Sequence, residues 1–227
     1  MKKIDLKSVN YKKVLQGSQK YIKEEKRDSM YRVATFLVDH FWYRSFGMSA
    51  GIGMLLLVWN QAYYRYCNFA LDFEGLAKFL GDNEKTIKEL RHRDISDFSE
   101  DADKNLIRKL FNNLLDVLKC EKRRSPVAVS KALHLLAPAF FPLWDGDISK
   151  AYGCYWYDSN QAWKKYLKFM TKAKNLSERI VVQYMDKNSL NREPAKESIC
   201  KEASSNMPFT KSLLKIIDEY NYASTKY

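Results

Sequence analysis

The chain is poor in the residues that interrupt helices. Only 8 of its 227 residues are glycine and only 5 are proline, and these residue types mark most turns and element ends. Alternation of apolar and polar positions, the pattern of a half-buried strand, is hard to find. Few breaks and few strand patterns predict an all-α fold of about ten helices joined by short loops.

Cysteine is scarce, and a long apolar run is lacking. The four cysteines, at positions 67, 120, 154 and 200, have no C-x-x-C spacing, which argues against a zinc site or a disulfide framework and predicts reduced thiols. The longest apolar run, Met48–Trp59, is shorter than the roughly 18 residues of a membrane span. The charged start, Met1–Asp5, lacks the apolar core of a signal peptide. These absences predict a soluble cytoplasmic protein without a membrane partner.

Basic charge and aromatic residues are plentiful. Lysine and arginine total 39 against 27 acidic residues, which gives a net charge of +12, and 46% of the residues are hydrophobic. This composition supplies a core and excludes a disordered chain. The excess charge favours a polyanionic partner, which is a nucleic acid, an acidic membrane face or an acidic protein, and does not choose between them.

Apolar residues recur mostly at helical spacing. The clearest pattern predicts an amphipathic helix at Lys104–Leu118. The other helices expected from spacing and capping residues are Tyr31–Tyr43, Ser49–Tyr66, Gln161–Met185 and about Thr210–Tyr220. Of these, Ser49–Tyr66 is apolar nearly all round, which predicts a helix buried in the middle of the fold. The polar stretch Asp186–Ser198 is expected to be a surface connection.

A basic cluster precedes a predicted helix start. Lys122, Arg123 and Arg124 lead into Ser125-Pro126, which has the pattern of an N-cap followed by proline at the first helical position. Free backbone N–H groups beside these cations would bind phosphate. The alternative is a solvated loop that is basic by chance.

The segment Ser125–Gly153 carries the most informative pattern. Its short predicted helix contains Lys131, a loop with two prolines follows, and Asp145 opens the next helical stretch. This layout resembles the helix-hairpin-helix DNA glycosylases, the superfamily of endonuclease III. In that family a lysine attacks the sugar C1′ atom, and an aspartate stands at the start of a later helix. The resemblance places Lys131 and Trp144-Asp145 at those positions.

A second stretch fits the same resemblance. The family has a buried helix ending in polar side chains near the gap left by a flipped base, and Leu55–Ala62 is similar, with Asn60 and Gln61 as the polar residues. The resemblance spans about residues 48–155 and implies duplex DNA as partner. It also implies one two-lobed unit over residues 1–227, with a middle lobe of residues 72–145 and a second lobe of residues 1–71 with 146–227.

The implied chemistry makes demands on both site residues. A lysine nucleophile must lose its proton, and burial, for example against Trp144, or the nearby charges of Arg123 and Arg124 would lower its pKa. Asp145 would stabilise the developing positive charge on the sugar, and Trp144 would stack on a flipped base. The alternatives are a surface position for Lys131 and an N-cap role for Asp145, which is compatible with catalysis. His134 is expected to be a hydrogen-bonded core residue.

Three functions remain open at this point. The first is a DNA-binding protein of glycosylase-like fold that excises a damaged base, with Lys131 as nucleophile and Asp145 as catalytic carboxylate. The second is a non-catalytic helical module that binds nucleic acid or an acidic protein, which the absence of glycine from residues 123–129 favours. The third is a structural protein whose charge aids solubility. We predict no cofactor and no metal, and the oligomeric state stays open.

Overall fold

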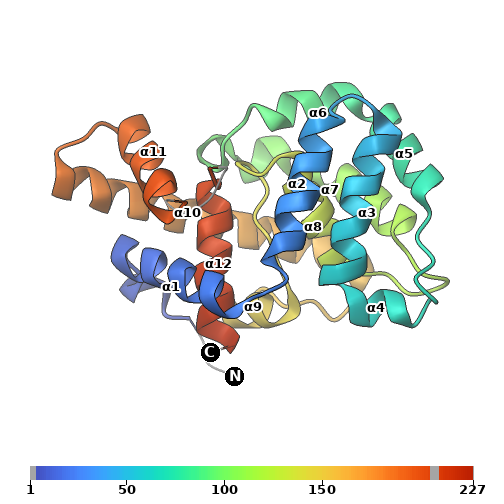
Figure 1. Cartoon of the computed structure of the whole chain (residues 1–227), viewed down its shortest axis with the longest axis horizontal. Helices are drawn as coiled ribbons and strands as arrows, with labels where there is room; N and C mark the ends of the chain where they lie inside the picture. The colour runs from blue at the N-terminus through green and yellow to red at the C-terminus, as the bar shows by residue number, and fades with distance from the viewer. Residues whose placement is uncertain (1–3, 205–209, 227) are drawn as a thin grey trace.

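Every regular element that the computed structural model describes is helical. The description covers residues 4–204 and 210–226, so the first three residues of the charged start lie outside it. Within those ranges are three short 3₁₀ turns, Leu6–Ser8, Ile95–Asp97 and Ser159–Gln161. The α-helices are α1 (Tyr11–Glu24), α2 (Asp28–His40), α3 (Ser45–Trp59), α4 (Gln61–Arg65), α5 (Phe73–Asp82), α6 (Glu84–Arg91), α7 (Glu100–Val117), α8 (Pro126–Leu136), α9 (Gly146–Ala151), α10 (Ala162–Asn188), α11 (Arg192–Ala203) and α12 (Leu213–Lys226) (Figure 1). The all-α prediction is confirmed, and none of these described helices is both long and apolar enough to cross a bilayer.

The predicted helices are present with shifted ends. The Lys104–Leu118 pattern lies in α7, which starts four residues earlier because the Ser99 side chain caps it. The predicted helix Ser49–Tyr66 is divided at Asn60, which ends α3 with its backbone outside the helical region. The Asn60 side-chain amide donates to the Ser125 hydroxyl over 3.0 Å, so a contact distant in sequence holds this break.

The surface connection expected at Asp186–Ser198 is wrong. Helix α10 continues to Asn188, and α11 begins at Arg192. Ser189 turns the chain by adopting a left-handed backbone conformation, with φ of 52°. Pro194 does not break α11 because it stands in the first turn, where backbone N–H groups have no partner within the helix.

Helix α8 forms the centre of the core. Ten of its eleven residues are buried, and it contacts α2, α3 and α7. Ser125 caps it through a hydrogen bond from the Ala128 N–H, with Pro126 at the first position, as predicted. The helix surrounded on all sides is therefore α8. The predicted stretch, Ser49–Tyr66, is buried along much of α3 but exposes Ala50 and, in α4, Gln61 and Ala62.

Glycines allow the closest helix approaches. Helices α1 and α12 pack along each other, and a Cβ atom on Gly17 would lie 2.6 Å from the Tyr220 ring. At the contact of α2 with α3, a Cβ atom on Gly51 would lie 3.1 Å from the Ala34 carbonyl oxygen. Any larger residue at these positions forces the helices apart.

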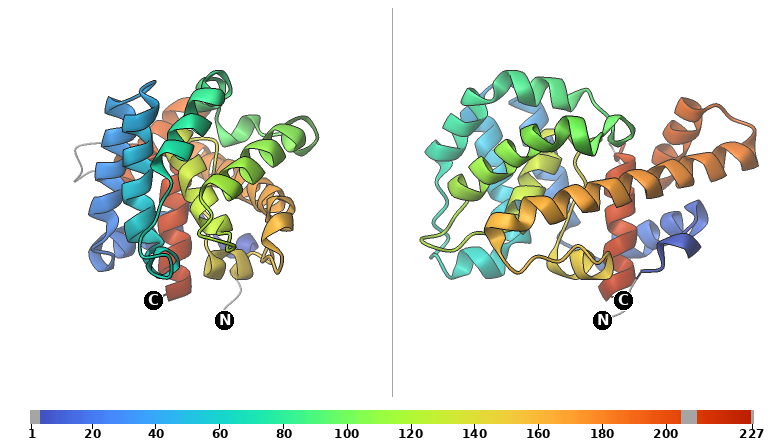
Figure 2. Two further views of the ribbon diagram at one scale, coloured as in Figure 1. Left: turned by 90° about the vertical axis from the view of Figure 1, so that its right-hand side faces the viewer. Right: turned by 180° about the vertical axis from the view of Figure 1, so that it is seen from behind.

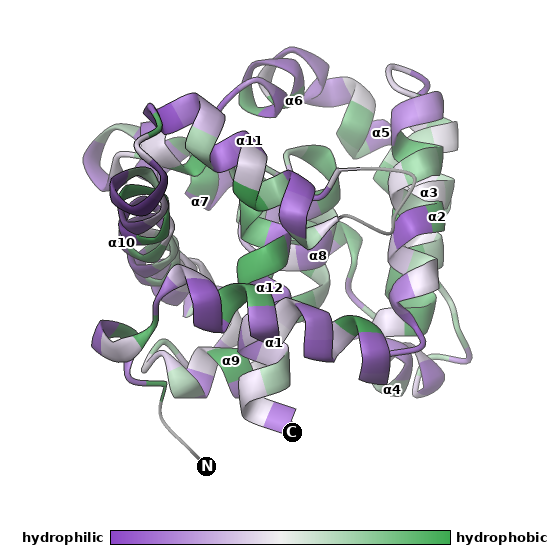
Figure 3. Ribbon diagram, turned by 60° about the vertical axis from the view of Figure 1, so that its left-hand side comes forward, coloured by the Kyte–Doolittle hydropathy of each residue, from purple (hydrophilic) through white to green (hydrophobic). Residues whose placement is uncertain are grey.

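Contacts between helices cross the boundary between the two predicted lobes. Helix α3 packs on α2 and on α5, so contacts cross the predicted lobe boundary at residue 72. Helix α10 crosses the front of the right-hand view in Figure 2 and packs on both α7 and α11. Figure 3 shows α8 and α12 in the middle of the ribbon, with helices on every side. The division into a middle and a second lobe stays a prediction.

The expectation of four reduced cysteines is wrong for two of them. Cys67 and Cys120 form a disulfide; their Cα atoms are 5.9 Å apart, and the two residues are 53 positions apart in sequence. Cys154 and Cys200 are free and buried. Sequence spacing could not reveal the pair because the folding of α4 toward the end of α7 brings the two cysteines together.

Candidate active site

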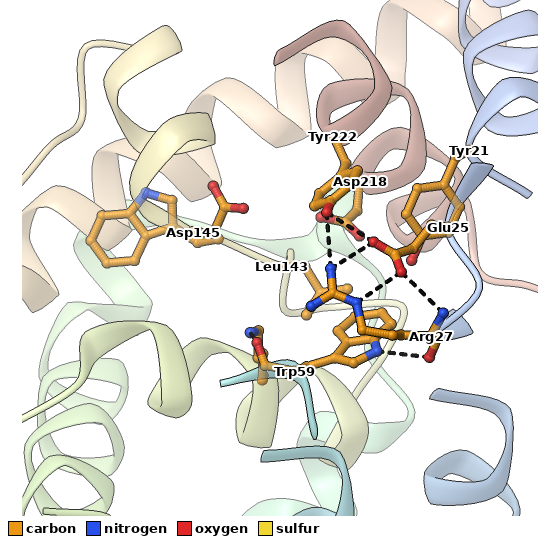
Figure 4. Close-up of a pocket in the computed structure, with 10 residues that line it drawn as sticks. Tyr21, Glu25, Arg27, Trp59, Leu143, Asp145, Asp218 and Tyr222 are labelled. Atoms are coloured by element: carbon orange, nitrogen blue, oxygen red, sulfur yellow. Dashed lines mark hydrogen bonds and ion pairs between the residues drawn. The ribbon is translucent and has the colours of Figure 1, made fainter. Parts of the chain in front are cut away.

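One pocket brings together residues from the beginning, middle and end of the chain (Figure 4). Its volume is about 490 Å³, the open mouth included. Helix α8 and the loop before α9 form one side, and the ends of α1 and α12 form the other. The aromatic rings of Tyr21, Trp59, Trp144 and Tyr222 line much of it. Its lining combines apolar surface with a few ionisable groups, the combination that small-ligand sites use.

Lys131 reaches this pocket from the second turn of α8. The residue is only 8% exposed, so the surface alternative is excluded. Its Nζ donates a hydrogen bond to the Trp59 carbonyl oxygen and lies 5.8 Å from the centre of the Trp59 ring. Burial lowers the pKa of Lys131 to about 8, against the opposing charges of Asp145 and Asp218. The neighbouring cation that helps to lower it is Arg27, in place of the expected Arg123 and Arg124.

Asp145 lines the same pocket. Its Oδ1 accepts a hydrogen bond of 2.7 Å from the Ile148 N–H at the start of α9, so the N-cap prediction is confirmed. The loop that carries it is tied to α8, because the Ser130 hydroxyl donates to the Trp144 carbonyl over 2.8 Å. Ser130, next to Lys131, is therefore bonded to Trp144, next to Asp145. This bond fixes the carboxylate relative to the amine.

A second carboxylate, which sequence reasoning missed, comes from α12. Asp218 lines the pocket and is 8% exposed. Burial raises the pKa of Asp218 to about 7, with the charges of Asp145 and Glu219 adding to the shift and those of Lys215 and Lys131 opposing it. Near neutral pH this carboxyl is therefore present in both protonation states.

The pocket mouth carries an ordered ion pair. Arg27 donates to both carboxylate oxygens of Glu25, with distances of 2.9 and 2.7 Å. The Tyr222 hydroxyl donates to the same carboxylate over 2.8 Å. These hydrogen bonds, that of Arg27 first, lower the pKa of Glu25 to about 2. Figure 4 shows this network across the pocket from Asp145.

A buried charge cluster lies beneath the pocket. Lys215 has no exposed surface, and its Nζ lies 3.0 Å from a Glu219 oxygen and 3.2 Å from an Asp28 oxygen. Burial opposes its charge, but Glu219 and other negative neighbours outweigh this and raise the pKa of Lys215 well above its usual value. Lys211, also buried, donates to Glu219 over 2.6 Å. The cluster anchors the start of α12 in the core and so positions Asp218.

His134 is the core histidine expected from the sequence. It is fully buried, with one ring nitrogen 2.7 Å from the Phe141 carbonyl oxygen and the other 2.9 Å from the Tyr31 hydroxyl. Burial lowers the pKa of His134 to about 3. The side chain links α2, α8 and the loop toward Asp145.

The remaining candidate nucleic-acid contacts are spread around the start of α8. Ser125 is buried, and its hydroxyl oxygen accepts hydrogen bonds from Asn60 and from the helix start. Gln61 is exposed at the start of α4. Trp144 lines the pocket but is 1% exposed and packs against Trp156, so its ring is largely covered by protein.

The basic loop before α8 is exposed. Lys122, Arg123 and Arg124 all face solvent. Arg124 pairs with Asp116 over 2.5 Å, and Arg123 lies over the Tyr66 ring. Lys131 lies about 9 Å along the helix axis from Ser125. The basic loop and the Lys131 amine are therefore both near the N-terminal half of α8.

The sequence contained one signal for the missed residues. The final helix places Lys215, Asp218 and Glu219 at spacings of three and four on an otherwise apolar stretch. Charges at that spacing share the buried face of the helix. For Glu25 and Arg27 no such signal exists, because their position follows from the turn between α1 and α2.

No group of three or more metal-ligating side chains is close enough to hold a metal within residues 4–204 and 210–226. Comparison of the chain with protein-family models, curated proteins and solved structures found no match.

Proposed function

We propose that the protein is a DNA N-glycosylase with abasic-site lyase activity, in which Lys131 is the nucleophile. The observation that carries the proposal is the placement of a buried lysine amine and the Asp145 carboxylate in one aromatic-lined pocket. The resemblance to the helix-hairpin-helix glycosylases and their two-lobed fold implied this pair of residues, and the pocket geometry is consistent with it.

The environment of Lys131 suits nucleophilic attack. With a pKa of about 8, about one amine in ten is unprotonated at pH 7, against about one in three thousand for an ordinary lysine. The free amine forms a bond to the sugar C1′ atom, and the bond from C1′ to the base breaks, with its electron pair leaving on the base. The amine loses a proton, and opening of the sugar ring gives a Schiff base.

Asp145 would act on the sugar as positive charge develops there. Its Oδ1 is engaged at the start of α9, while Oδ2 has no hydrogen-bond or ion-pair partner among the described residues. A carboxylate held in this way stabilises an oxocarbenium-like transition state without reorganising. Trp59 lines the pocket and is partly exposed, so its ring is available to contact a base that has left the stack.

The basic loop provides the phosphate contacts in this proposal. Lys122 and Arg123 are exposed at the start of the helix that carries Lys131. Cations at a helix start attract phosphate groups. Duplex DNA bound to this loop would lie at the start of α8, the helix that carries the Lys131 amine.

Base release and borohydride trapping test the proposal. Purified protein is incubated with duplexes that contain an abasic site, uracil or an oxidised purine, and borohydride reduces any Schiff base to a stable adduct. We expect a covalent adduct on the abasic duplex, and its loss in Lys131→Gln. Lys150→Gln is the matched control, since Lys150 is an exposed lysine on α9 and its replacement removes the same charge outside the pocket.

A non-catalytic binding module is the second candidate. One observation favours it, namely the absence of glycine from residues 123–129. Such a module gives no adduct on any duplex, while its affinity for DNA falls about 10³-fold between roughly 50 and 200 mM salt if it contacts six phosphates. The absence of both an adduct and salt-sensitive binding refutes both candidates.

A further inference from the structure

The pocket holds two carboxyls in different surroundings. Asp145 caps a helix, and its Oδ1 accepts a backbone hydrogen bond. Asp218 projects from α12, and the Lys215 Nζ lies 3.9 Å from its Oδ2. No hydrogen bond to the Asp218 carboxyl is found within residues 4–204 and 210–226. A carboxyl that accepts no hydrogen bond is stabilised less as an anion than one that caps a helix.

The two carboxyls also lie on separate elements of the pocket. Figure 4 shows Asp218 on the α12 side, close to Tyr222, and Asp145 across the open space of the pocket. A substrate that enters between them meets a carboxyl on each side. This arrangement allows one group to face the sugar and the other to face the departing base.

We propose that Asp218 is the acid that protonates the base as it leaves. The inference rests on the proposed glycosylase function and names a catalytic residue on an element outside the resemblance, which spans about residues 48–155. In this step the bond between C1′ and the base nitrogen breaks, and its electron pair accepts the proton from the Asp218 carboxyl. Asp218 becomes a carboxylate and is reprotonated from solvent through the open mouth of the pocket.

The surroundings of Asp218 support this role. Its pKa of about 7 keeps a large fraction of the carboxyl protonated in neutral solution. Burial is the main cause of this raised pKa, and the charged groups that modify it are Lys215 and Glu219 on α12, Asp145 before α9 and Lys131 on α8. General acids are most effective when their pKa lies near the working pH. Such a carboxyl can hold a proton at neutral pH and still release it to a leaving group.

Asp218→Asn separates the two chemical steps. Release of a damaged base requires protonation of that base as it leaves. An abasic duplex has already lost its base, so its reaction with Lys131 does not need this proton. We expect base release to fall by at least about 100-fold in the variant, the usual contribution of a general acid. Trapping on the abasic duplex should persist or quicken, because removal of the Asp218 charge favours the neutral Lys131 amine. Asp147→Asn is the matched control. It makes the same substitution at a carboxyl that pairs with Lys226 and does not line the pocket.

The pH profiles provide a second readout that a merely structural role does not move. Base release by the wild type needs a neutral Lys131 and a protonated Asp218, so it should peak at about pH 7.5 and decline on both sides. Trapping on the abasic duplex needs only the neutral amine, and should rise to a plateau above about pH 8. Persistent trapping in Asp218→Asn also shows that the variant is folded.

The outcomes distinguish the two proposals. Undiminished base release in Asp218→Asn overturns the acid role and leaves the glycosylase function standing. Equal loss of base release and trapping in that variant also overturns it, because the residue then acts only through the structure of the site. If the wild type itself gives neither base release nor an adduct, the proposed function fails first.

Discussion

Replacing Lys131 by methionine should make the protein more stable at neutral pH. Burial lowers the pKa of this amine from 10.5 to about 8, and a shift of that size means that its charged form costs about 3 kcal/mol of folding free energy. Methionine has a similar length and no charge. The variant also loses the hydrogen bond to the Trp59 carbonyl, which costs about 1 kcal/mol. The net gain is about 2 kcal/mol, or about 6 °C in melting temperature.

The gain should disappear at alkaline pH. The folded-state pKa of Lys131 lies below the unfolded-state value, so the unfolded chain binds more protons between about pH 8 and pH 10.5. Wild-type stability therefore rises with pH in that window relative to Lys131→Met. Above about pH 10.5 the amine is neutral in both states and the cost is gone.

Urea titrations of both proteins across this pH range measure the difference. Lys150→Met serves as the control, because Lys150 is exposed and its replacement should give no comparable pH-dependent difference. A Lys131→Met variant that is less stable than the wild type at pH 7, or a difference that stays constant with pH, would refute the account of this site. The expected stabilisation has a functional meaning, since a residue that weakens the fold is kept for another reason.

Three further predictions concern the framework of the site. His134→Leu should cost about 2–4 kcal/mol, because it leaves two buried oxygens without a hydrogen donor or acceptor, and a melting temperature close to the wild type would contradict this. Reduction of the Cys67–Cys120 disulfide, which closes a loop of 53 positions, should lower stability by about 4 kcal/mol. Urea unfolding with and without reductant measures that loss, and coincident curves would argue against it. Lys215→Met should lower stability by about 3–5 kcal/mol because it removes the cation between the buried carboxylates of Asp28 and Glu219, and an unchanged unfolding midpoint would show that the cluster does not anchor α12.

The helix pattern could be predicted from the sequence because it depends on local spacing. The apolar repeat in α7, the Ser125 cap and the Asp145 cap are all set by residues within a few positions of one another. The prediction failed at Asp186–Ser198, where composition was taken as the signal of a loop. The burial of Ala195 and Ile199 against neighbouring helices makes that polar stretch helical.

Only the site residues that come from one continuous stretch of sequence could be predicted. Lys131 lies on α8 and Asp145 in the loop that joins α8 to α9, so one segment brings both residues to the pocket. Asp218 reaches the pocket because α12 packs along α1 and contacts α9, and such long-range packing has no local pattern. The Cys67–Cys120 disulfide was missed for the same reason.

The central claim is that the Lys131 amine bonds to the sugar. The most direct measurement is peptide mapping of the borohydride-reduced complex with an abasic duplex, by digestion and mass spectrometry. The account predicts a single modified lysine, Lys131, on the peptide from α8. A sugar adduct on any other lysine, or no adduct on a duplex that the protein demonstrably binds, would contradict it.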